Sequence, residues 1–323
     1  MTTSASTMMK KVERYLVHKR SLGYKMAEGG RRLRSFARYA DLHAPGGPLT
    51  VNLAVCWASS PKDATCFHHA HRLSTVRVFA RYLTVFDSRT EIPPHQLFGS
   101  AARRVPPYIY ARREIMALIR DVLPGPVNQK HRAVLGVRNA TIIGLLACTG
   151  MRVGEALALK NREVDLSRNV ITVHQSKNLP MRLVPISASA SSHLRQYQAV
   201  RDQQFGTGED SNAFFRSSCG GHVLHSTIWR AFRGARNRIG LGPTARRKPR
   251  LHDLRHTFAC NHLLRAYREN RNIDNAVHDL SIYLGHSSLA ETYWYISAVP
   301  ALFRLCSKRS EALGLLLRKG GLL

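Results

Sequence analysis

The sequence has no long hydrophobic run. None of its 323 residues lies in a stretch that approaches the roughly 20 uninterrupted apolar residues of a membrane-spanning helix. The N-terminus also lacks the apolar segment of a secretory signal peptide. These absences argue against an integral membrane protein and a secreted one, so we expect a soluble, cytoplasmic protein.

Cysteine pairs are also missing. No two of the six cysteines form a C-x-x-C pair, and they lie far apart at Cys56, Cys66, Cys148, Cys219, Cys260 and Cys306. This spacing favours reduced thiols over a disulfide framework or a cysteine zinc site. Cys66 is followed by His68, His69 and His71, but adjacent histidines on a helix point in different directions and no second group of ligands is evident. We therefore expect no metal ion and no other cofactor.

Acidic residues are few. Asp and Glu total 20 against 49 Lys and Arg, which gives a net charge of +29 and a pI near 10.9. Such an excess repels itself unless a polyanion neutralises it, and nucleic acid is the usual polyanion. An anionic membrane surface is the alternative. It ranks lower because the charge is spread along the chain rather than gathered in one amphipathic segment.

The length predicts two domains. The first domain is placed at residues 1–97, where the pattern is helical from Met9 to about Val85, with one apolar run at Leu73, Val76, Phe79 and Leu83. Three arginines are interleaved with that run and predict a basic face able to lie against phosphates: Arg72, Arg77 and Arg81. We expect this region to be a small helical DNA-binding domain.

Proline-rich composition marks the boundary between the domains. Pro93, Pro94, Pro106 and Pro107 disfavour helix and favour an extended segment. We place a linker at residues 98–107, with Arg103 and Arg104 as further candidate DNA contacts, and a second domain at residues 108–323.

The second domain is predicted to be mainly helical with a small β-sheet, an α+β fold. Helical patterns cover residues 113–122, 134–148, 191–204 and 227–239, and most of the chain beyond residue 252. Residues 169–174 and 182–186 read as paired strands, and Lys177 lies in the turn between them. A basic loop supplies three more candidate DNA contacts, Arg246, Arg247 and Lys248.

The segment LHDLRHTFA places His252 and Arg255 three residues apart. On a helix they share one face and could grip an anion together. Taken alone this spacing is weak, because a solvated surface or an ion pair with Asp253 is the better explanation of it in isolation.

That segment is one of four motifs in a fixed order. They are TGMRVGEALAL around Arg152, the hairpin SKNLPMRLVPI around Lys177, LHDLRHTFA itself, and YLGHSSLAETYWYI from Tyr283 to Ile296. Together they resemble the tyrosine recombinase (phage integrase) family over about residues 108–297. The N-terminal part resembles the family's core/arm-type DNA-binding domain only in length, helicity and basicity. The resemblance implies two domains that close around duplex DNA as a C-shaped clamp.

The resemblance also implies an activity, site-specific cutting and rejoining of DNA through a 3′-phosphotyrosyl intermediate, without metal or ATP. Arg152 and Arg255 would clamp the non-bridging oxygens of the scissile phosphate, because guanidinium groups donate paired hydrogen bonds to oxyanions. Glu155 would orient Arg152, although a surface ion pair is an equal alternative. His252 and His286 would donate hydrogen bonds to the phosphate or assist proton transfer.

The resemblance assigns the general acid to Lys177, which would protonate the departing 5′ oxygen. A merely solvated turn lysine is the alternative, and Lys160 and Arg182 lie nearby. The family places its nucleophile nine residues after the histidine of the L-G-H motif, which gives Tyr295 rather than Tyr293. Because few phenols are ionised at neutral pH, neighbouring cations must lower the tyrosine pKa or a base must take its proton.

Double-stranded DNA is the expected partner, in a homotetrameric synapse with possible accessory DNA-bending proteins. Apolar positions in residues 300–323 predict a C-terminal helix that docks on a neighbouring protomer or on its own domain. The basicity favours a mobile element. A type IB topoisomerase and a non-catalytic DNA-binding regulator are the alternatives.

Overall fold

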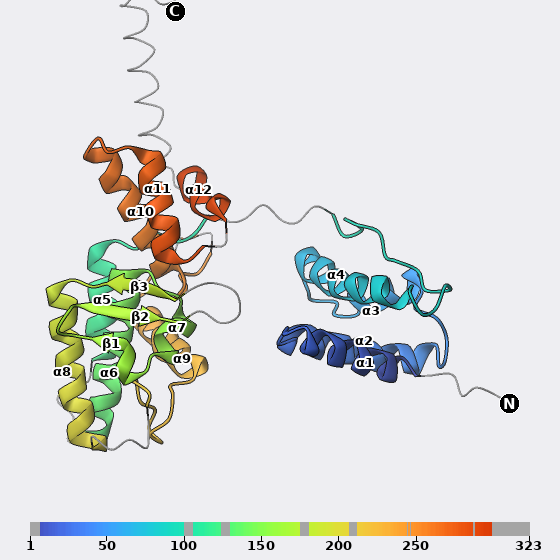
Figure 1. Cartoon of the computed structure of the whole chain (residues 1–323), viewed down its shortest axis with the longest axis horizontal. Coiled ribbons are helices and arrows are strands. Elements are labelled where there is room, and N and C mark those ends of the chain that lie inside the picture. The colour runs from blue at the N-terminus through green and yellow to red at the C-terminus, as the bar shows by residue number, and fades with distance from the viewer. Residues whose placement is uncertain are drawn as a thin grey trace, which may run out of the picture. The chain divides into compact units, whose positions relative to one another are not determined.

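Helices make up most of the chain, as the ribbon in Figure 1 shows. The computed structural model describes residues 7–99, 106–123, 130–174, 181–206, 212–243, 245, 247–286 and 288–298. The chain divides into two units, Met1–Arg104 and Val105–Leu323. Within the described ranges, no helix is long and apolar enough to cross a membrane.

The first unit is a bundle of four helices. They are α1 (Met8–Ser21), α2 (Ala27–His43), α3 (Val51–Ser59) and α4 (Cys66–Leu83). Threonine side chains cap three of the N-termini, because Thr7, Thr50 and Thr65 each accept a hydrogen bond from a backbone N–H of the first turn. The predicted apolar run of α4 is fully buried, together with Phe36 and Trp57, which confirms that face of the helix.

The second unit is helical with a three-stranded antiparallel sheet in the order β1-β2-β3. Its elements are α5 (Arg112–Val122), α6 (Lys130–Thr149), α7 (Val153–Ala158), a 3-10 turn (Asn161–Glu163), β1 (Val164–Asp165), β2 (Val170–Val173), β3 (Arg182–Pro185), α8 (Ala188–Phe205), α9 (His225–Arg238), α10 (Asp253–Arg268), α11 (Ile273–Leu284) and α12 (Leu289–Ala298). This architecture confirms the predicted α+β class.

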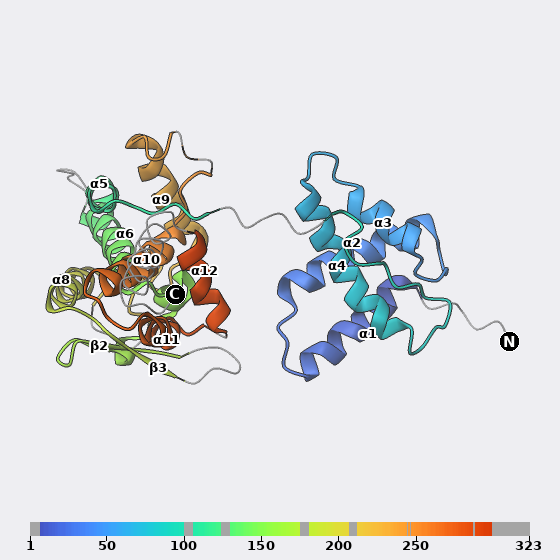
Figure 2. The same ribbon diagram turned by 90° about the horizontal axis from the view of Figure 1, so that it is seen from above.

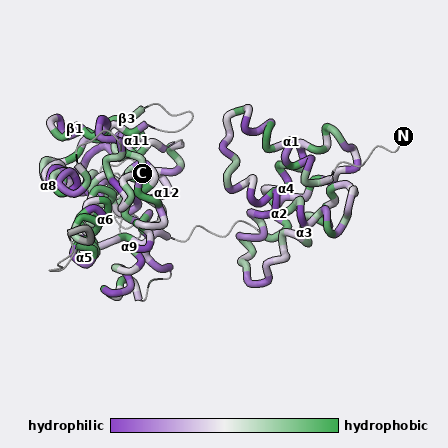
Figure 3. Tube along the Cα trace, turned by 90° about the horizontal axis from the view of Figure 1, so that it is seen from below, coloured by the Kyte–Doolittle hydropathy of each residue, from purple (hydrophilic) through white to green (hydrophobic). Residues whose placement is uncertain are grey.

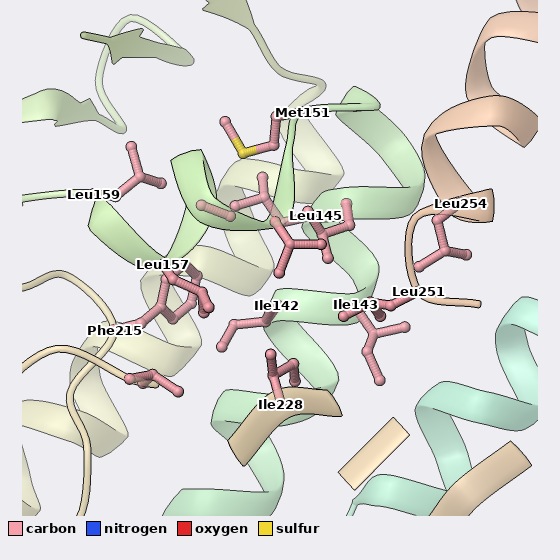
Figure 4. Close-up of a cluster of buried hydrophobic side chains, with 14 of the residues drawn as sticks. Ile142, Ile143, Leu145, Met151, Leu157, Leu159, Phe215, Ile228, Leu251 and Leu254 are labelled. Carbon is pink, nitrogen blue, oxygen red and sulfur yellow. The ribbon is translucent and has the colours of Figure 1, made fainter. Parts of the chain in front are cut away.

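Helix α6 lies at the centre of the larger core of this unit. Its residues Ile142, Ile143 and Leu145 are buried, and Figure 4 shows them between Leu157 on one side and Leu254 on the other. The peripheral helix α8 is mostly hydrophilic by contrast (Figure 3). The apolar side chains of α6 therefore fix the positions of α7 and α10, whose ends carry the predicted site residues.

A smaller core joins α10, α11 and α12. It contains Cys260, Leu263, Leu280, Leu284 and Tyr295. Strand β3 contacts α11, and Figure 2 shows the two side by side. This packing brings the sheet, α10 and α12 together at one end of the unit.

Candidate active site

Two glycine turns bring the ends of three helices together. Gly150 follows α6 with φ 62° and Gly285 follows α11 with φ 66°, both in the left-handed region that glycine adopts without strain. A Cβ atom at residue 150 would lie 2.6 Å from Cδ1 of Phe258 on α10, so only glycine permits this approach. Arg152 comes two residues after the first turn and His286 directly follows the second.

The two turns hold Arg152 and Arg255 through backbone carbonyls. Arg255 donates from Nη1 to Gly150 O at 2.8 Å and from Nη2 to Leu284 O at 2.9 Å. Arg152 donates from Nη2 to Gly285 O at 2.8 Å. Carbonyls at the C-terminal end of a helix have no partner within the helix, so a guanidinium is a suitable donor for them. Both arginines are therefore fixed before any substrate arrives.

Glu155 bonds to two arginines. It accepts from Arg152 at Nη1 (2.9 Å) and backbone N (2.8 Å), and from Arg182 at Nη2 (2.6 Å) and Nη1 (3.1 Å). Burial alone raises the pKa of Glu155, but the hydrogen bonds from Arg182 and Arg152 outweigh burial and leave the pKa below its ordinary value. The carboxylate therefore stays ionised and fixes the orientation of Arg152.

Helix α10 supplies a histidine and an arginine to the site. Arg255 is 3% exposed, and His252 is the N-cap residue of the helix, with its ring packed against that of His256. Burial, and then the charge of Arg152, lower the pKa of Arg255 to about 10, so the guanidinium remains charged at neutral pH. Burial, and then the charge of Arg255, lower the pKa of His252, so its ring is mainly neutral.

His286 contacts two residues of α12. Its Nδ1 is 2.7 Å from Oγ1 of Thr292, and its ring stacks on that of Tyr295 with centroids 6.1 Å apart. Burial, and then the charge of Arg255, lower the pKa of His286 to about 4. A neutral imidazole therefore lies against α12, within reach of the charge of Arg255.

The two candidate tyrosines differ in orientation. Tyr295 is 3% exposed, and its hydroxyl lies 3.2 Å from Nδ1 of His256. Tyr293 is 43% exposed, and its hydroxyl donates to Oδ1 of Asp274 at 3.0 Å. The structure thus places Tyr295, and not Tyr293, among the histidines and Arg255.

The pKa of Tyr295 is higher than that of an ordinary tyrosine. Burial raises it more than the neighbouring Arg255 lowers it. Of the two routes expected from sequence, lowering of the pKa by cations and removal of the proton by a base, this raised pKa favours the second.

Two contributors to the site were not among the predicted residues. Arg182 is 9% exposed and also donates from Nε to Tyr283 O at 3.0 Å. The alternation of residues along the strand could have indicated its position, because it puts Arg182 on the same inward face as Val184. His256 lies four residues after His252, so the helical repeat placed both on one face of α10.

The predicted DNA contacts in the first unit need one correction. Arg77 is 8% exposed and donates from Nε to Pro93 O at 2.8 Å and from Nη2 to Pro94 O at 2.6 Å. It therefore holds the proline segment against α4 instead of forming part of the predicted basic face. Arg72 stacks over the ring of Trp57 at 3.9 Å and is partly buried, whereas Arg81 is exposed.

In the second unit, Arg247 and Lys248 are exposed. Several predicted residues lie outside the described part of the chain, namely Arg103, Arg104, Lys177, Arg246 and the tail at residues 300–323. Among the described residues, no group of three His, Cys, Asp or Glu side chains could hold a metal ion.

The fold and the site together define a class of protein. A helical unit with a small sheet gathers two fixed arginines and several neutral histidines beside one buried tyrosine, and this is the arrangement of the tyrosine recombinases.

Comparisons with known proteins specify the family. The phage integrase family matches residues 121–301. The chain is 37% identical over 308 residues to the putative integrase/recombinase y4rB of Sinorhizobium fredii, covering 95% of this chain and 98% of that protein. It is 28% identical over 228 residues to the tyrosine recombinase XerC of Roseiflexus castenholzii, covering 70% and 66%. The chain belongs to the phage integrase family and is a site-specific tyrosine recombinase.

Solved structures agree on the fold. The XerH site-specific recombinase bound to its palindromic difH substrate matches with a TM-score of 0.67 at 17% identity, over 94% of this chain and 85% of that one. The Tn1549 transposon integrase in complex with transposon right end DNA matches with a TM-score of 0.66 at 15% identity, over 96% and 100%.

Proposed function

We propose that this recombinase cuts and rejoins double-stranded DNA through a 3′-phosphotyrosyl bond to Tyr295, without metal or ATP. The observation that carries the proposal is the position of the Tyr295 hydroxyl, 3.2 Å from His256 on the same helix that carries Arg255. Tyr293 instead donates its hydrogen bond to Asp274. These contacts support Tyr295 as the nucleophile.

The arginines stabilise the charge that develops on the phosphate. A guanidinium carries five N–H donors, so the bonds of Arg152 and Arg255 to backbone carbonyls leave donors for the non-bridging oxygens. Donors fixed in advance do not need to reorganise as the five-coordinate phosphorus forms. His252 and His286 add hydrogen bonds to the same oxygens, and Lys177 protonates the departing 5′ oxygen.

Resealing uses the same groups in reverse. The phosphotyrosyl bond conserves the energy of the broken phosphodiester, so a 5′ hydroxyl from a partner strand displaces Tyr295 without ATP. Exchange between two duplexes follows when the step is repeated on paired sites.

Duplex DNA as the partner is supported by the net charge of +29. It is also supported by the similar XerH and Tn1549 structures, which are complexes with a difH DNA substrate and with transposon right end DNA. We propose that the two units close around DNA as a clamp and that the remaining basic candidates contact phosphates. Those candidates are Arg72, Arg81, Arg103, Arg104, Arg246, Arg247 and Lys248.

The integrase names of the relatives support a role in the movement of a mobile element in the cytoplasm. We propose a homotetramer on DNA, joined through residues 300–323 and aided by DNA-bending proteins. Deletion of the chain from Ala301 onward should abolish the pairing of two DNA sites in a synapsis assay and leave binding to a single site intact. Unchanged pairing by the truncated protein would contradict this role of the tail.

The nucleophile is tested with a nicked suicide duplex made from the DNA that flanks the coding gene. Because a nicked strand loses its 5′ hydroxyl fragment after cleavage, the covalent adduct accumulates and is seen in denaturing electrophoresis. Tyr295→Phe should abolish the adduct and Tyr293→Phe should retain it. The reverse pattern would overturn the assignment.

A further inference from the structure

His256 lies between the predicted site residues on α10 and the tyrosine on α12. Its ring packs edge-on against His252 with centroids 4.8 Å apart and against Trp294 at 5.6 Å. The centroid of the Tyr295 ring is 5.4 Å away, and Nδ1 of His256 is 3.2 Å from the Tyr295 hydroxyl. Aromatic neighbours on two sides and a hydrogen bond fix the orientation of this imidazole.

We propose that His256 is the base that receives the hydroxyl proton of Tyr295 as the hydroxyl oxygen attacks phosphorus. The inference rests on the proposed function, because it needs Tyr295 to be the nucleophile. It assigns a catalytic role to a histidine other than His252 and His286.

The hydrogen-bond chemistry of the neighbours singles out this histidine. Two side chains beside the Tyr295 hydroxyl can be compared: Nδ1 of His256 lies 3.2 Å from it, and the nearby Arg255 lowers the tyrosine pKa through its charge and a hydrogen bond. A guanidinium has donors and no acceptor, whereas a neutral imidazole has one nitrogen that accepts. Of these two neighbours, only His256 can therefore take the proton.

The surroundings keep His256 neutral before DNA binds. Burial lowers its pKa to about 3, and the remaining causes are the nearby groups His252, Arg250, Arg255 and His286. A neutral ring can accept the hydrogen bond, but it is a weak base in this state. A bound phosphate held by Arg255 brings negative charge close to His256, and the five-coordinate phosphorus adds more. Both changes raise the pKa of His256 as the reaction proceeds.

The step balances without a co-reactant. The O–H bond of Tyr295 breaks, its electron pair forms the bond from Oη to phosphorus, and the proton moves to Nδ1 of His256. The bond from phosphorus to the 5′ oxygen breaks with its electrons on oxygen, which takes a proton from the general acid proposed at Lys177. On resealing, the tyrosine leaves as the phenolate and recovers the proton from His256.

Two substitutions separate proton transfer from structure. His256→Phe keeps an aromatic ring and removes the hydrogen-bond acceptor. His256→Asn keeps an acceptor, because its amide oxygen lies near the position of Nδ1, but this oxygen does not become protonated at neutral pH. His262→Asn is the matched control, because His262 is a partly buried histidine of the same helix, six residues after His256. The measurement is the single-turnover rate of adduct formation on the nicked suicide duplex, with DNA binding followed by gel shift.

We expect His256→Phe to slow adduct formation on the order of 100-fold and His256→Asn about 10-fold, because general base catalysis typically contributes 10²- to 10⁴-fold. His262→Asn should keep the wild-type rate, and all three should bind DNA like the wild type. A duplex with a bridging 5′ sulfur should not rescue His256→Phe, since a thiolate leaves without a proton and relieves only a missing general acid.

Wild-type rates in both His256 variants, or rescue of His256→Phe by sulfur, would overturn the role of His256. His256→Phe could fail to fold, which would show as a changed circular dichroism spectrum or as loss of DNA binding. In that case the rate of adduct formation by His256→Asn is compared with that of His262→Asn, and equal rates reject the inference. Tyr295→Phe is run in parallel. An adduct that persists in Tyr295→Phe refutes the proposed nucleophile, whereas its loss together with full activity of the His256 variants refutes this inference alone.

Discussion

At the scale of single residues, Glu155 forms ion pairs with both Arg152 and Arg182. Its side chain is 11% exposed and that of Arg182 is 9% exposed, so the pair is poorly solvated. Glu155→Gln removes the charge and leaves Arg182 and Arg152 without a counterion. We expect a loss on the order of 3 kcal/mol in the free energy of unfolding, the usual result of removing one partner of a buried ion pair, together with slower adduct formation.

Urea denaturation at pH 7 measures that loss, and Asp165→Asn is the matched control. Asp165 pairs with Arg168, but their side chains are 45% and 84% exposed, and exposed pairs contribute little. A loss in Asp165→Asn as large as that in Glu155→Gln would contradict the argument from burial.

The same carboxylate predicts a dependence on pH. Because the folded pKa of Glu155 is lowered, its contribution to stability is present above the unfolded pKa and is lost as the pH falls through the folded pKa. The difference in unfolding free energy between wild type and Glu155→Gln should therefore shrink in acid. Urea titrations at neutral and acidic pH test this, and a constant difference would argue against an ionised Glu155.

How much of the site follows from sequence depends on where its contacts lie in the chain. Short motifs are enough to nominate Arg152, Arg255 and Tyr295, because each motif has a fixed spacing. The contacts from Arg182 to Glu155 and from His256 to Tyr295 join residues 27 and 39 positions apart. Only the packing of β3 and α12 reveals them.

At the scale of elements, the turn after α6 sets the distance between Arg152 and α10. Gly150→Ala adds a Cβ atom 2.6 Å from Phe258 at a backbone φ of 62°. We expect a loss of about 1–3 kcal/mol in unfolding free energy from the strained backbone. Adduct formation should fall as well, because Gly150 O would no longer hold Arg255.

The control for this turn is Gly154→Ala. Residue 154 lies inside α7, and a Cβ atom there meets nothing within 4 Å. Alanine should therefore stabilise the helix by about 0.5–1 kcal/mol or leave it unchanged. Thermal unfolding and the suicide-substrate assay separate the two variants, and a Gly150→Ala protein as stable and active as Gly154→Ala would refute the role of the turn.

Regular elements were predictable where their pattern was long. The strands expected at residues 169–174 and 182–186 are observed at Val170–Val173 and Arg182–Pro185, and the helix expected at 113–122 is observed at Arg112–Val122. Strand β1 has two residues and takes its shape from pairing with Ile171 and Val170 of β2. A segment that short has no periodicity of its own, so sequence could not indicate it.

At the scale of the whole molecule, the net charge of +29 requires that DNA binding weaken steeply with salt. Each phosphate contact contributes about 0.9 to the slope of log K against log salt. If Arg247 and Lys248, both exposed, contact phosphates, replacing both with alanine should reduce the slope by roughly 2.

Arg77→Ala also removes a positive charge, but from a buried side chain. It therefore distinguishes an effect of the net charge of the protein from an effect of direct contacts to phosphates. Its guanidinium bonds to Pro93 O and Pro94 O, so the substitution should lower the unfolding free energy of the first unit and leave the salt slope unchanged. Fluorescence anisotropy with one labelled duplex at several salt concentrations measures all three proteins. A reduced slope in Arg77→Ala, or an unchanged slope in the double variant, would mean that binding follows total charge rather than the placement of individual cations.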